Sequence, residues 1–437
     1  MEDWMSTTRF RKFSRDAKGN FAVMTAAIAS VLALGIGYGI NVAQLSKVRS
    51  NLIGALDAAV TSTARDLTTG RIAGKDARAS VEAFLMANGS ADFIRPGTLA
   101  LESIVVDTSA STVSARAHVD VDLLFPVFAA GNSRRIAVES AALYSDKRIE
   151  VAMMLDVTGS MAGQKIKDLK SAANAALDAF LAGQDPAKPR VRVAIVPYAD
   201  AVNTGALSNV VHVEKGFTTG EPPKLDDPVA AAAAPDKCAT ERKGSNQFTD
   251  ASPYAGKVNR DYRLAFCPKA ALAPLSADLS SLKKAVGAFA ADGYTGGHTG
   301  IQWSWYMLSP KWRDVLPKAA APADHDAKKV AKIAILMTDG EFNTAFAGVA
   351  KGKDTRNQAA LSRSHAEKLC AAMRKDGIEV FTVGFMLKEA GAKAVMKACA
   401  SPDSGPITHY FETSSGAELT EAFLSIARNV ERLAVTK

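Results

Sequence analysis

The feature that most constrains the fold is an alternation of buried strands and amphipathic helices from residue 149 onward. The stretch "RIEVAMMLD", which ends at Asp156, has nearly contiguous apolar residues, as expected of a strand buried on both faces. Residues 163–182 follow with apolar positions at helical spacing. The same pattern predicts further strands at 191–198, 332–339, 378–385 and 408–412. It predicts helices near 279–290, 357–375, 388–399 and 416–433, and one more that begins near 299. This alternation predicts an α/β domain over 149–437, built on a doubly wound, mostly parallel sheet with an insertion at about 200–275.

The 437 residues exceed what one hydrophobic core usually supports, so a second domain is expected ahead of the α/β domain. Apolar residues recur at three- and four-residue steps through 41–67, which predicts an amphipathic helix. Residues 99–125 and 134–144 alternate apolar and polar side chains, as half-buried antiparallel strands do. We therefore interpret residues 43–148 as a small α+β domain.

The stretch 21–40, "FAVMTAAIASVLALGIGYGI", contains no charged residue and is long enough for a helix to cross the hydrocarbon core of a bilayer. Basic residues precede it at five positions: Arg9, Arg11, Lys12, Arg15 and Lys18. The positive-inside rule then predicts a cytoplasmic N-terminus (1–20), one transmembrane helix (21–42) and export of the remainder. A cleaved signal peptide is the alternative, although its apolar core normally has about 7–15 residues.

The charge pattern does not favour nucleic acid as a partner. The net charge is +8, but the Lys and Arg residues are scattered and form no basic block interleaved with aromatic side chains. Charged residues make up 22% of the chain and hydrophobic residues 48%, an ordinary composition for globular domains.

Carboxylates and hydroxyls follow the predicted strands where those strands end. Asp156 closes the first strand, and Asp339 closes the strand in "AILMTDG". Hydroxyl side chains accompany them: Thr158 and Ser160 directly after Asp156, and Thr295, with Thr299, in the Gly-rich "ADGYTGGHTG". Ligands of doubly wound sheets bind beyond the carboxyl ends of the strands, so these side chains are expected to meet in one solvent-facing crevice.

Such a group is an all-oxygen site, which suits Mg²⁺, Mn²⁺ or Ca²⁺ and disfavours zinc. The expected metal ligands are Asp156, Thr158, Ser160, Thr295 and Asp339. Hydroxyls coordinate without adding charge, so the cation stays electrophilic and can accept a carboxylate from a partner. The nearest histidine, His298, is interpreted as a loop-surface residue outside the site.

Each part of this site also has a purely structural interpretation. Asp156 can act as the cap of the following helix, and Asp339–Gly340 can form an ordinary turn. The metal site is favoured because both carboxylates end apolar strands of one domain, with a Thr-bearing Gly-rich loop between them.

Three separated motifs resemble the metal-ion-dependent adhesion site (MIDAS) of von Willebrand factor type A domains. They are Asp-x-Thr-x-Ser at 156–160, Thr295 in "GYT" and Asp339 in "MTDGE". The family usually has Ser where Thr158 stands, and Thr158 keeps the ligating oxygen. The resemblance spans about 149–433 and implies a Rossmann-like fold that binds a protein partner through a divalent cation.

Over nearly the whole length, the chain also resembles TadG-type proteins of bacterial tight-adherence (Flp) pilus systems. The matching stretches are the basic "RDAKGNFAVMTA", the membrane segment, "DVTGSM", "GIQWSWYMLSP" and "CAS". This resemblance implies a pilin-like domain at 43–148 and an adhesion or assembly protein anchored in the bacterial inner membrane, with its C-terminal bulk in the periplasm or cell envelope. The implied partner is a pilus or Tad-system component, or a surface ligand, and no enzymatic activity is expected.

Two rival functions stay open. "MMLDVTGS" superficially resembles the Asp-x-Asp nucleophile motif of haloacid-dehalogenase-like phosphatases, but Thr158 replaces the second Asp, which would be the general acid. The second rival function is that of a structural periplasmic scaffold whose metal site is vestigial. Serine hydrolysis is disfavoured because Ser160 does not stand in a Gly-x-Ser-x-Gly elbow.

The four cysteines are expected to form disulfides, because export places them in an oxidising compartment. The helices before and after the strand at 378–385 should lie side by side on one face of the sheet, since crossovers between parallel strands are right-handed. Cys370 and Cys399 end these two helices, so a Cys370–Cys399 bridge is predicted. Cys238–Cys267 within the insertion follows by elimination.

Overall fold

The structure, a computed structural model, describes residues 19–88, 94–108, 110–126, 132–145, 147–182, 184, 189–214, 236–327 and 329–436. It divides into two compact units. The first comprises residues up to Arg65 with Ala73–Tyr144, and the second comprises Asp66–Ile72 with Ser145–Lys437. The basic residues between Arg9 and Lys18, which determine the expected membrane orientation, lie outside the described residues.

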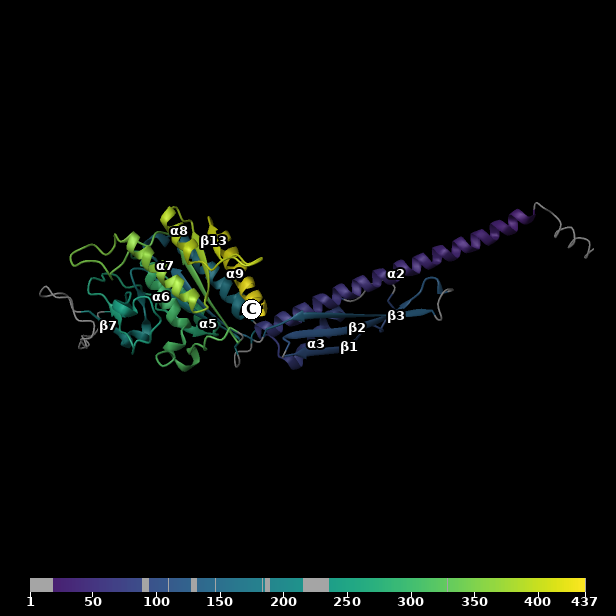
Figure 1. Ribbon diagram of the computed structural model, residues 1–437, viewed down its shortest axis with the longest axis horizontal. Coiled ribbons are helices and arrows are strands. Elements are labelled where there is room, and N and C mark those ends of the chain that lie inside the picture. Colours follow the sequence, from purple (N-terminus) through teal and green to yellow (C-terminus); the bar gives the residue numbers. More distant parts are fainter. Residues whose placement is uncertain are drawn as a thin grey trace, which may run out of the picture. The chain divides into compact units, whose positions relative to one another are not determined.

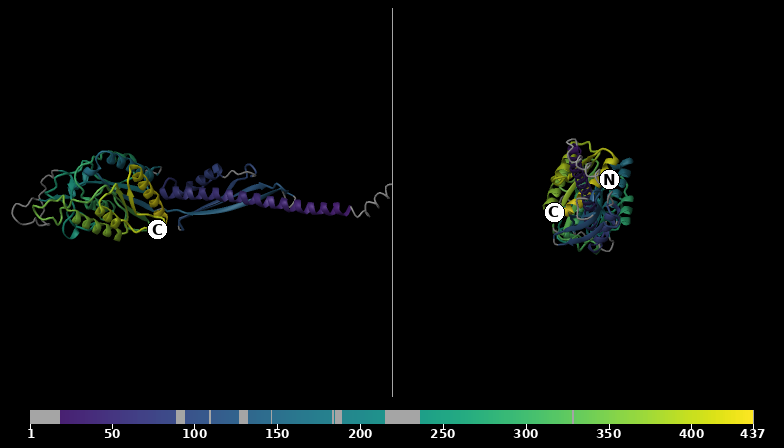
Figure 2. Two further views of the ribbon diagram at one scale, coloured as in Figure 1. Left: turned by 90° about the horizontal axis from the view of Figure 1, so that it is seen from above. Right: turned by 90° about the vertical axis from the view of Figure 1, so that its right-hand side faces the viewer.

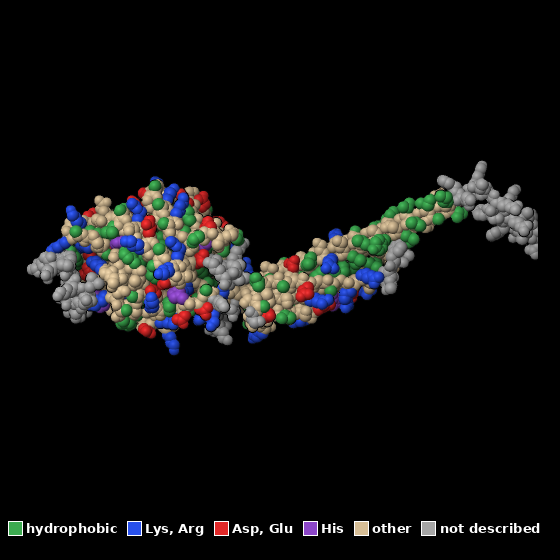
Figure 3. Space-filling view, viewed as in Figure 1, with side chains coloured by type: hydrophobic (Ala, Val, Ile, Leu, Met, Phe, Trp, Pro, Cys, Tyr) green, Lys and Arg blue, Asp and Glu red, His purple; other side chains and the backbone are tan. Residues whose placement is uncertain are grey.

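Helix α2 (Gly19–Thr69) joins the uncharged stretch and the amphipathic stretch in one continuous helix. It is the one helix among the described residues that is long and apolar enough to cross a membrane, judged by length and composition alone. Large apolar side chains are exposed along its N-terminal part, Val23 at 66% and Val31 at 68%, and they form a hydrophobic surface there (Figure 3). A surface of this kind is more stable against lipid or another protein than in water.

The first unit packs this helix against a three-stranded antiparallel sheet. After α2 come helix α3 (Ala77–Asn88) and strands β1 (Ala100–Asp107), β2 (Thr112–Asp122) and β3 (Ser133–Leu143), paired in the order β1-β2-β3. Alternate residues of β2 are fully buried, which is the burial pattern that the sequence alternation predicts. Gln44 Nε2 of α2 donates to the carbonyl oxygen of Asp122 at 2.8 Å, and α2 runs alongside the strands (Figure 2).

The second unit is built on a six-stranded, mostly parallel sheet (Figure 1). Its strands, in spatial order, are β10 (Ala273–Ser276), β5 (Val191–Tyr198), β4 (Arg148–Asp156), β11 (Val330–Thr338), β12 (Glu379–Phe385) and β13 (Tyr410–Thr413). Only β10 runs antiparallel within this sheet. It is a short edge strand that contains Pro274, as edge strands can, and the sequence pattern does not predict it.

Helices cover both faces of this sheet. Two groups of helices pack on it: α4 (Gln164–Leu181), α5 (Leu279–Gly287) and α9 (Gly416–Thr436) on one face, and α6 (Gly297–Leu308), α7 (Ala359–Lys375) and α8 (Ala390–Cys399) on the other. Met153 of β4 packs in the core of the first group and Met154 in the core of the second, because successive strand residues point to opposite faces. The contiguous apolar run that ends at Asp156 is therefore buried from both sides.

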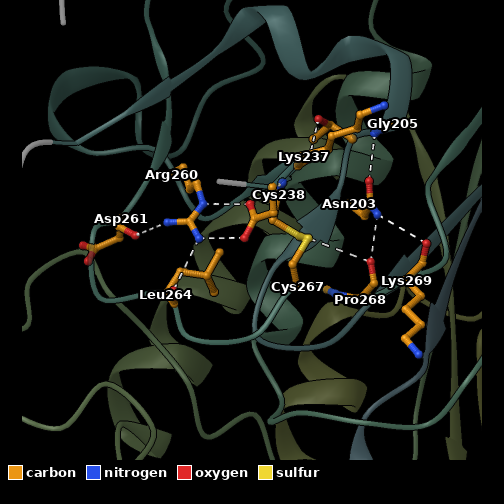
Figure 4. Close-up of a disulfide and its surroundings, with 12 residues drawn as sticks. Asn203, Gly205, Lys237, Cys238, Arg260, Asp261, Leu264, Cys267, Pro268 and Lys269 are labelled. Atoms are coloured by element: carbon orange, nitrogen blue, oxygen red, sulfur yellow. Dashed lines mark hydrogen bonds and ion pairs between the residues drawn. A yellow bond between two sulfur atoms is a disulfide. The ribbon is translucent and has the colours of Figure 1, made fainter. Parts of the chain in front are cut away.

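The described parts of the insertion contain four short strands: β6 (Val202–Asn203), β7 (Val211–Val213), β8 (Cys238–Ala239) and β9 (Val258–Arg260). A disulfide joins Cys238 to Cys267 (Figure 4). Beside it, the Arg260 guanidinium donates to both carboxylate oxygens of Asp236, at 2.8 and 2.7 Å. These cross-links hold in place a segment that has little regular secondary structure.

The second disulfide joins Cys370 of α7 to Cys399 at the end of α8. The two helices lie next to each other and flank β12 in the sequence, which is the arrangement that a right-handed crossover produces. Both bridges are the pairs that the sequence analysis expects.

Candidate metal centre

Asp156 ends β4 at the carboxyl edge of the parallel sheet and is fully buried. Its Oδ1 accepts hydrogen bonds from the backbone N–H and the hydroxyl of Thr158, at 2.9 and 2.6 Å. Its Oδ2 accepts from the hydroxyls of Tyr198 and Thr338, both at 2.8 Å. The expectation that Asp156 faces solvent is wrong, because the last residues of β5 and β11 each place a hydroxyl over its carboxylate.

Hydroxyl groups connect the two carboxylates. The hydroxyl oxygens of Thr158 and Ser160 are 2.9 Å apart, and the Ser160 hydroxyl donates to Asp339 Oδ1 at 2.5 Å. Asp339 directly follows β11, the parallel neighbour of β4. Four of the five expected ligands thus form one continuous hydrogen-bonded group between two adjacent strand ends.

Thr295, the fifth expected ligand, lies on the Gly-rich loop before α6 and makes no hydrogen bond to the other four among the described residues. The loop is attached to the Asp156 loop through backbone bonds from Gly159 N to Gly293 O, at 2.9 Å, and from Asp292 N to Val157 O, at 3.0 Å. The backbone N–H of Thr295 donates to Asn343 Oδ1 at 3.0 Å, which joins the loop to the segment after Asp339. Three loops therefore meet, as the sequence analysis expects, although Thr295 is held by backbone contacts.

Sequence reasoning missed Asp200, which positions the Thr295 loop. Asp200 lies two residues beyond β5, and its Oδ2 accepts from the backbone N–H of Tyr294 at 2.6 Å. Its burial raises the pKa of the Asp200 carboxyl, and the Arg356 guanidinium, 3.3 Å away, acts in the opposite direction. The sequence does contain a signal for this residue: in "VPYAD", Asp200 follows a third parallel strand, as Asp156 and Asp339 follow the other two.

The electrostatics of the centre favour an added positive charge. Burial, followed by the nearby Asp339 carboxylate, raises the pKa of Asp156 to about 6, and hydrogen bonds from Thr158 and Tyr198 oppose this rise. The Lys165 ammonium of α4 contacts Asp339 Oδ2 at 2.8 Å and supplies one positive charge. Two carboxylates so close together repel each other when both are ionised, and a cation bound between them removes that repulsion.

The donor set fits a hard divalent cation. Two carboxylates and the hydroxyls of Thr158 and Ser160 lie within one hydrogen-bonded group, and oxygen ligands of this kind suit Mg²⁺, Mn²⁺ or Ca²⁺. The four residues together would hold the ion at the open end of the group, since Ser160 is exposed.

Two neighbouring residues differ from their expected environments. His298 does not lie on a loop surface: it is the second residue of α6 and is 1% exposed. Thr299 is also inside α6 and fully buried. Both are enclosed because α6 begins at Gly297, two residues earlier than the sequence pattern predicts, and Glu241 of the insertion contacts its first turn at His298.

No protein-family model and no curated protein sequence matches this chain. Among solved structures, it is similar to the von Willebrand factor domain of the type V pilus tip protein Mfa5 from Porphyromonas gingivalis. The sequence identity is 14% and the TM-score is 0.37, and the match covers 67% of this chain and 97% of that chain. It is also similar to the pilus adhesin SpaC from Lactobacillus rhamnosus GG, with 13% identity, 79% and 36% covered, and a TM-score of 0.37.

A third similar structure is proximal thread matrix protein 1 from the mussel byssus, solved with a zinc-occupied MIDAS motif. It has 14% identity to this chain, 66% of this chain and 46% of that chain covered, and a TM-score of 0.31. At these scores none of the three likenesses bears on what this chain does.

Proposed function

We propose that this chain is a membrane-anchored adhesion or assembly protein of a tight-adherence pilus system, whose doubly wound domain of the von Willebrand factor type A kind binds a protein partner through a divalent cation. The observation that carries the proposal is the hydrogen-bonded group of Asp156, Thr158, Ser160 and Asp339 at the carboxyl edge of the sheet. Mg²⁺ is the expected ion, with Mn²⁺ or Ca²⁺ as substitutes.

The mechanism is binding without turnover. Two carboxylates supply two negative charges, and neutral hydroxyls supply the other protein ligands, so the bound ion keeps a position for an Asp or Glu of the partner. Thr158 stands where a phosphatase would need its second carboxylate, and its hydroxyl donates a hydrogen bond to Asp156 Oδ1. A hydroxyl at this position can serve as a metal ligand, but it cannot act as the general acid that a phosphatase of this type needs.

The test is co-purification of the full-length protein, in detergent, with partners from the membranes of its own cells. The expected result is a partner that stays bound in Mg²⁺, is released by EDTA, and is absent from an Asp339→Asn variant. A Lys167→Met variant is the matched control, because Lys167 is exposed on α4 and makes no contact with the centre among the described residues. A partner retained equally in EDTA and in Asp339→Asn would exclude metal-mediated binding.

A structural scaffold with a vestigial site is a second candidate, and one contact favours it. The Lys165 ammonium lies 2.8 Å from Asp339 Oδ2, where it neutralises a carboxylate that a cation would otherwise bind. On this account the chain would bind its partners without metal, and the metal titration of the wild-type protein would be flat.

A further inference from the structure

A second group of metal-type ligands lies apart from the candidate centre, in the second unit. It consists of Glu241, His298 and His365, whose ligand atoms all lie within 4.8 Å of one another. The three side chains are 1%, 1% and 5% exposed. They come from segments far apart in sequence: the insertion after β8, the first turn of α6, and α7. We call them the Glu-His-His cluster.

Two of the three side chains, His298 and Glu241, are held in their orientation by further hydrogen bonds. His298 Nδ1 lies 2.8 Å from the Ser362 hydroxyl, so a hydrogen bond fixes this ring and directs its Nε2 toward Glu241. Glu241 Oε1 accepts from the backbone N–H groups of Phe346 and Ala347, both at 2.6 Å. Contacts of this type hold metal-ligating His and carboxylate groups in position, and for His they also select the nitrogen that binds.

The same two ligands carry buried atoms without a hydrogen-bond partner. Glu241 Oε2 and His298 Nε2 are both enclosed, and neither makes a hydrogen bond. Buried polar atoms are rarely left in this state, and such exceptions often mark an ion or a water that belongs in the site. A metal ion bound to both atoms would satisfy them together.

The spacing between the Glu241 carboxylate and the His298 imidazole matches that between two ligands of one ion. His298 Nε2 lies 3.4 Å from Glu241 Oε1. Tetrahedral zinc with bonds of about 2.0–2.1 Å separates its ligand atoms by about 3.3–3.4 Å. The rings of His298 and His365 stand edge to face, with centroids 5.3 Å apart, and a ligand atom of His365 lies within 4.8 Å of those of the other two side chains.

We propose that the Glu-His-His cluster binds one divalent transition-metal ion of the zinc type. Two imidazoles and one carboxylate are a ligand set that zinc prefers, whereas Mg²⁺ and Ca²⁺ prefer the all-oxygen centre at Asp156. The ion joins the insertion to α6 and α7, and Glu241 extends this link to the backbone of 346–347. Its role is structural, and it does not depend on the function proposed for the Asp156 centre.

Without a metal, the cluster would instead contain an ion pair between Glu241 and a protonated His298. Both accounts use the same 3.4 Å contact, and metal analysis separates them. The full-length protein is purified in detergent without chelator and without added metal, and its metal content is measured by mass spectrometry. We expect about one zinc ion per chain, as a buried site of this kind retains its ion through purification.

Variants assign the ion to its site. His298→Gln and His365→Gln should each lose most of the zinc, while Asp156→Asn and the matched control His118→Gln should keep it. His118 belongs to the first unit, where it pairs with Glu102. Zinc that is lost in Asp156→Asn and kept in the two cluster variants would place the ion at the carboxyl edge and overturn the proposal.

One measurement does not depend on the folding of any variant. X-ray absorption at the zinc edge of the wild-type protein should show the outer-shell scattering of imidazole ligands, which the all-oxygen centre cannot produce. A wild-type protein that contains no transition metal, and takes none up from added Zn²⁺ or Co²⁺, contradicts the proposal. Zinc without imidazole scattering contradicts it as well.

Discussion

At the scale of single residues, the burial of Asp156 changes how the centre must be probed. Asp156→Ala would remove the carboxylate to which the hydroxyls of Thr158, Tyr198 and Thr338 donate, at a cost of about 1–3 kcal/mol for any buried group that is left unpaired. Asp156→Asn keeps the shape of the side chain and one of its two oxygen acceptors while removing its charge. The amide is therefore the variant that separates metal binding from folding.

The raised pKa of Asp156 predicts a pH dependence of stability in EDTA. The folded protein holds this proton up to about pH 6, whereas the unfolded chain releases it near the ordinary aspartate value of about 4. The folded state therefore binds more protons between these values, and the free energy of unfolding falls as the pH rises through this window. Each unit of pKa difference corresponds to about 1.4 kcal/mol.

The measurement compares melting temperatures of wild type and Asp156→Asn in EDTA from pH 4 to 7. The difference between the two proteins should shift in favour of the variant as the pH rises, and millimolar Mg²⁺ should restore the wild type. Parallel curves for the two proteins would show that Asp156 titrates normally.

Lys165 competes with a cation for Asp339. Its ammonium contacts Asp339 Oδ2 at 2.8 Å, so a metal ion must displace it or bind beside its positive charge. Lys165→Met should therefore strengthen Mg²⁺ binding, by about tenfold if the contact contributes about 1.4 kcal/mol. Calorimetric titration measures the change, with Lys167→Met on the same helix as the control; equal affinity in all three proteins would contradict the competition.

At the scale of elements, the loop before α6 depends on Gly293. Its φ of +81° is unfavourable for other residues, and an added Cβ would lie 2.6 Å from Asp200 Oδ2. Gly293→Ala should lower the free energy of unfolding by about 1–3 kcal/mol and weaken metal binding, because the loop carries Thr295.

Thermal denaturation and metal titration test this substitution together. Gly287→Ala is the matched control, since nothing lies within 4 Å of its added Cβ and it ends helix α5. A Gly293→Ala protein as stable as wild type would show that the loop tolerates a side chain.

The sequence predicts the elements of the second unit well where burial has a periodic signature. β4 and β11 are buried on both faces, so their apolar runs are continuous, and α4 buries one stripe of side chains. The positions of Asp156 and Asp339 follow from the ends of these strands.

Other features lack such a signal. The buried environment of His298 depends on Glu241 and Ser362, which come from distant segments. Asp200 follows a strand as Asp156 does, but its role depends on a backbone contact with Tyr294 that no side-chain pattern encodes. Irregular segments such as the insertion contribute through long-range contacts, and a single sequence does not specify these.

At the scale of the whole molecule, the disulfides predict an oxidising compartment for the second unit. Removing one bridge with a serine pair, Cys370→Ser with Cys399→Ser, should lower the free energy of unfolding by roughly 2–4 kcal/mol, because the loop between the cysteines gains freedom in the unfolded chain. Non-reducing peptide mapping checks the pairing first. Free thiols or crossed pairs in protein from its own cells would contradict export.

The membrane anchor is tested by fractionation and a reporter. The exposed apolar surface of α2 predicts that the full-length protein sediments with membranes and resists extraction by high salt. A reporter fused after Lys437 should be active only in a periplasmic assay. A full-length protein that is soluble without detergent would contradict the anchor.

The most direct test of the central claim is calorimetric titration of the full-length protein, in detergent, with Mg²⁺, Mn²⁺ and Ca²⁺. The account predicts saturable binding of at least one of these ions at or below about millimolar concentration, corresponding to a binding free energy of at least about 4 kcal/mol in magnitude. Asp156→Asn and Asp339→Asn should abolish this binding and stay folded, while His298→Gln should retain it. Wild-type protein that shows neither heat nor a thermal shift with any of the three ions contradicts the account.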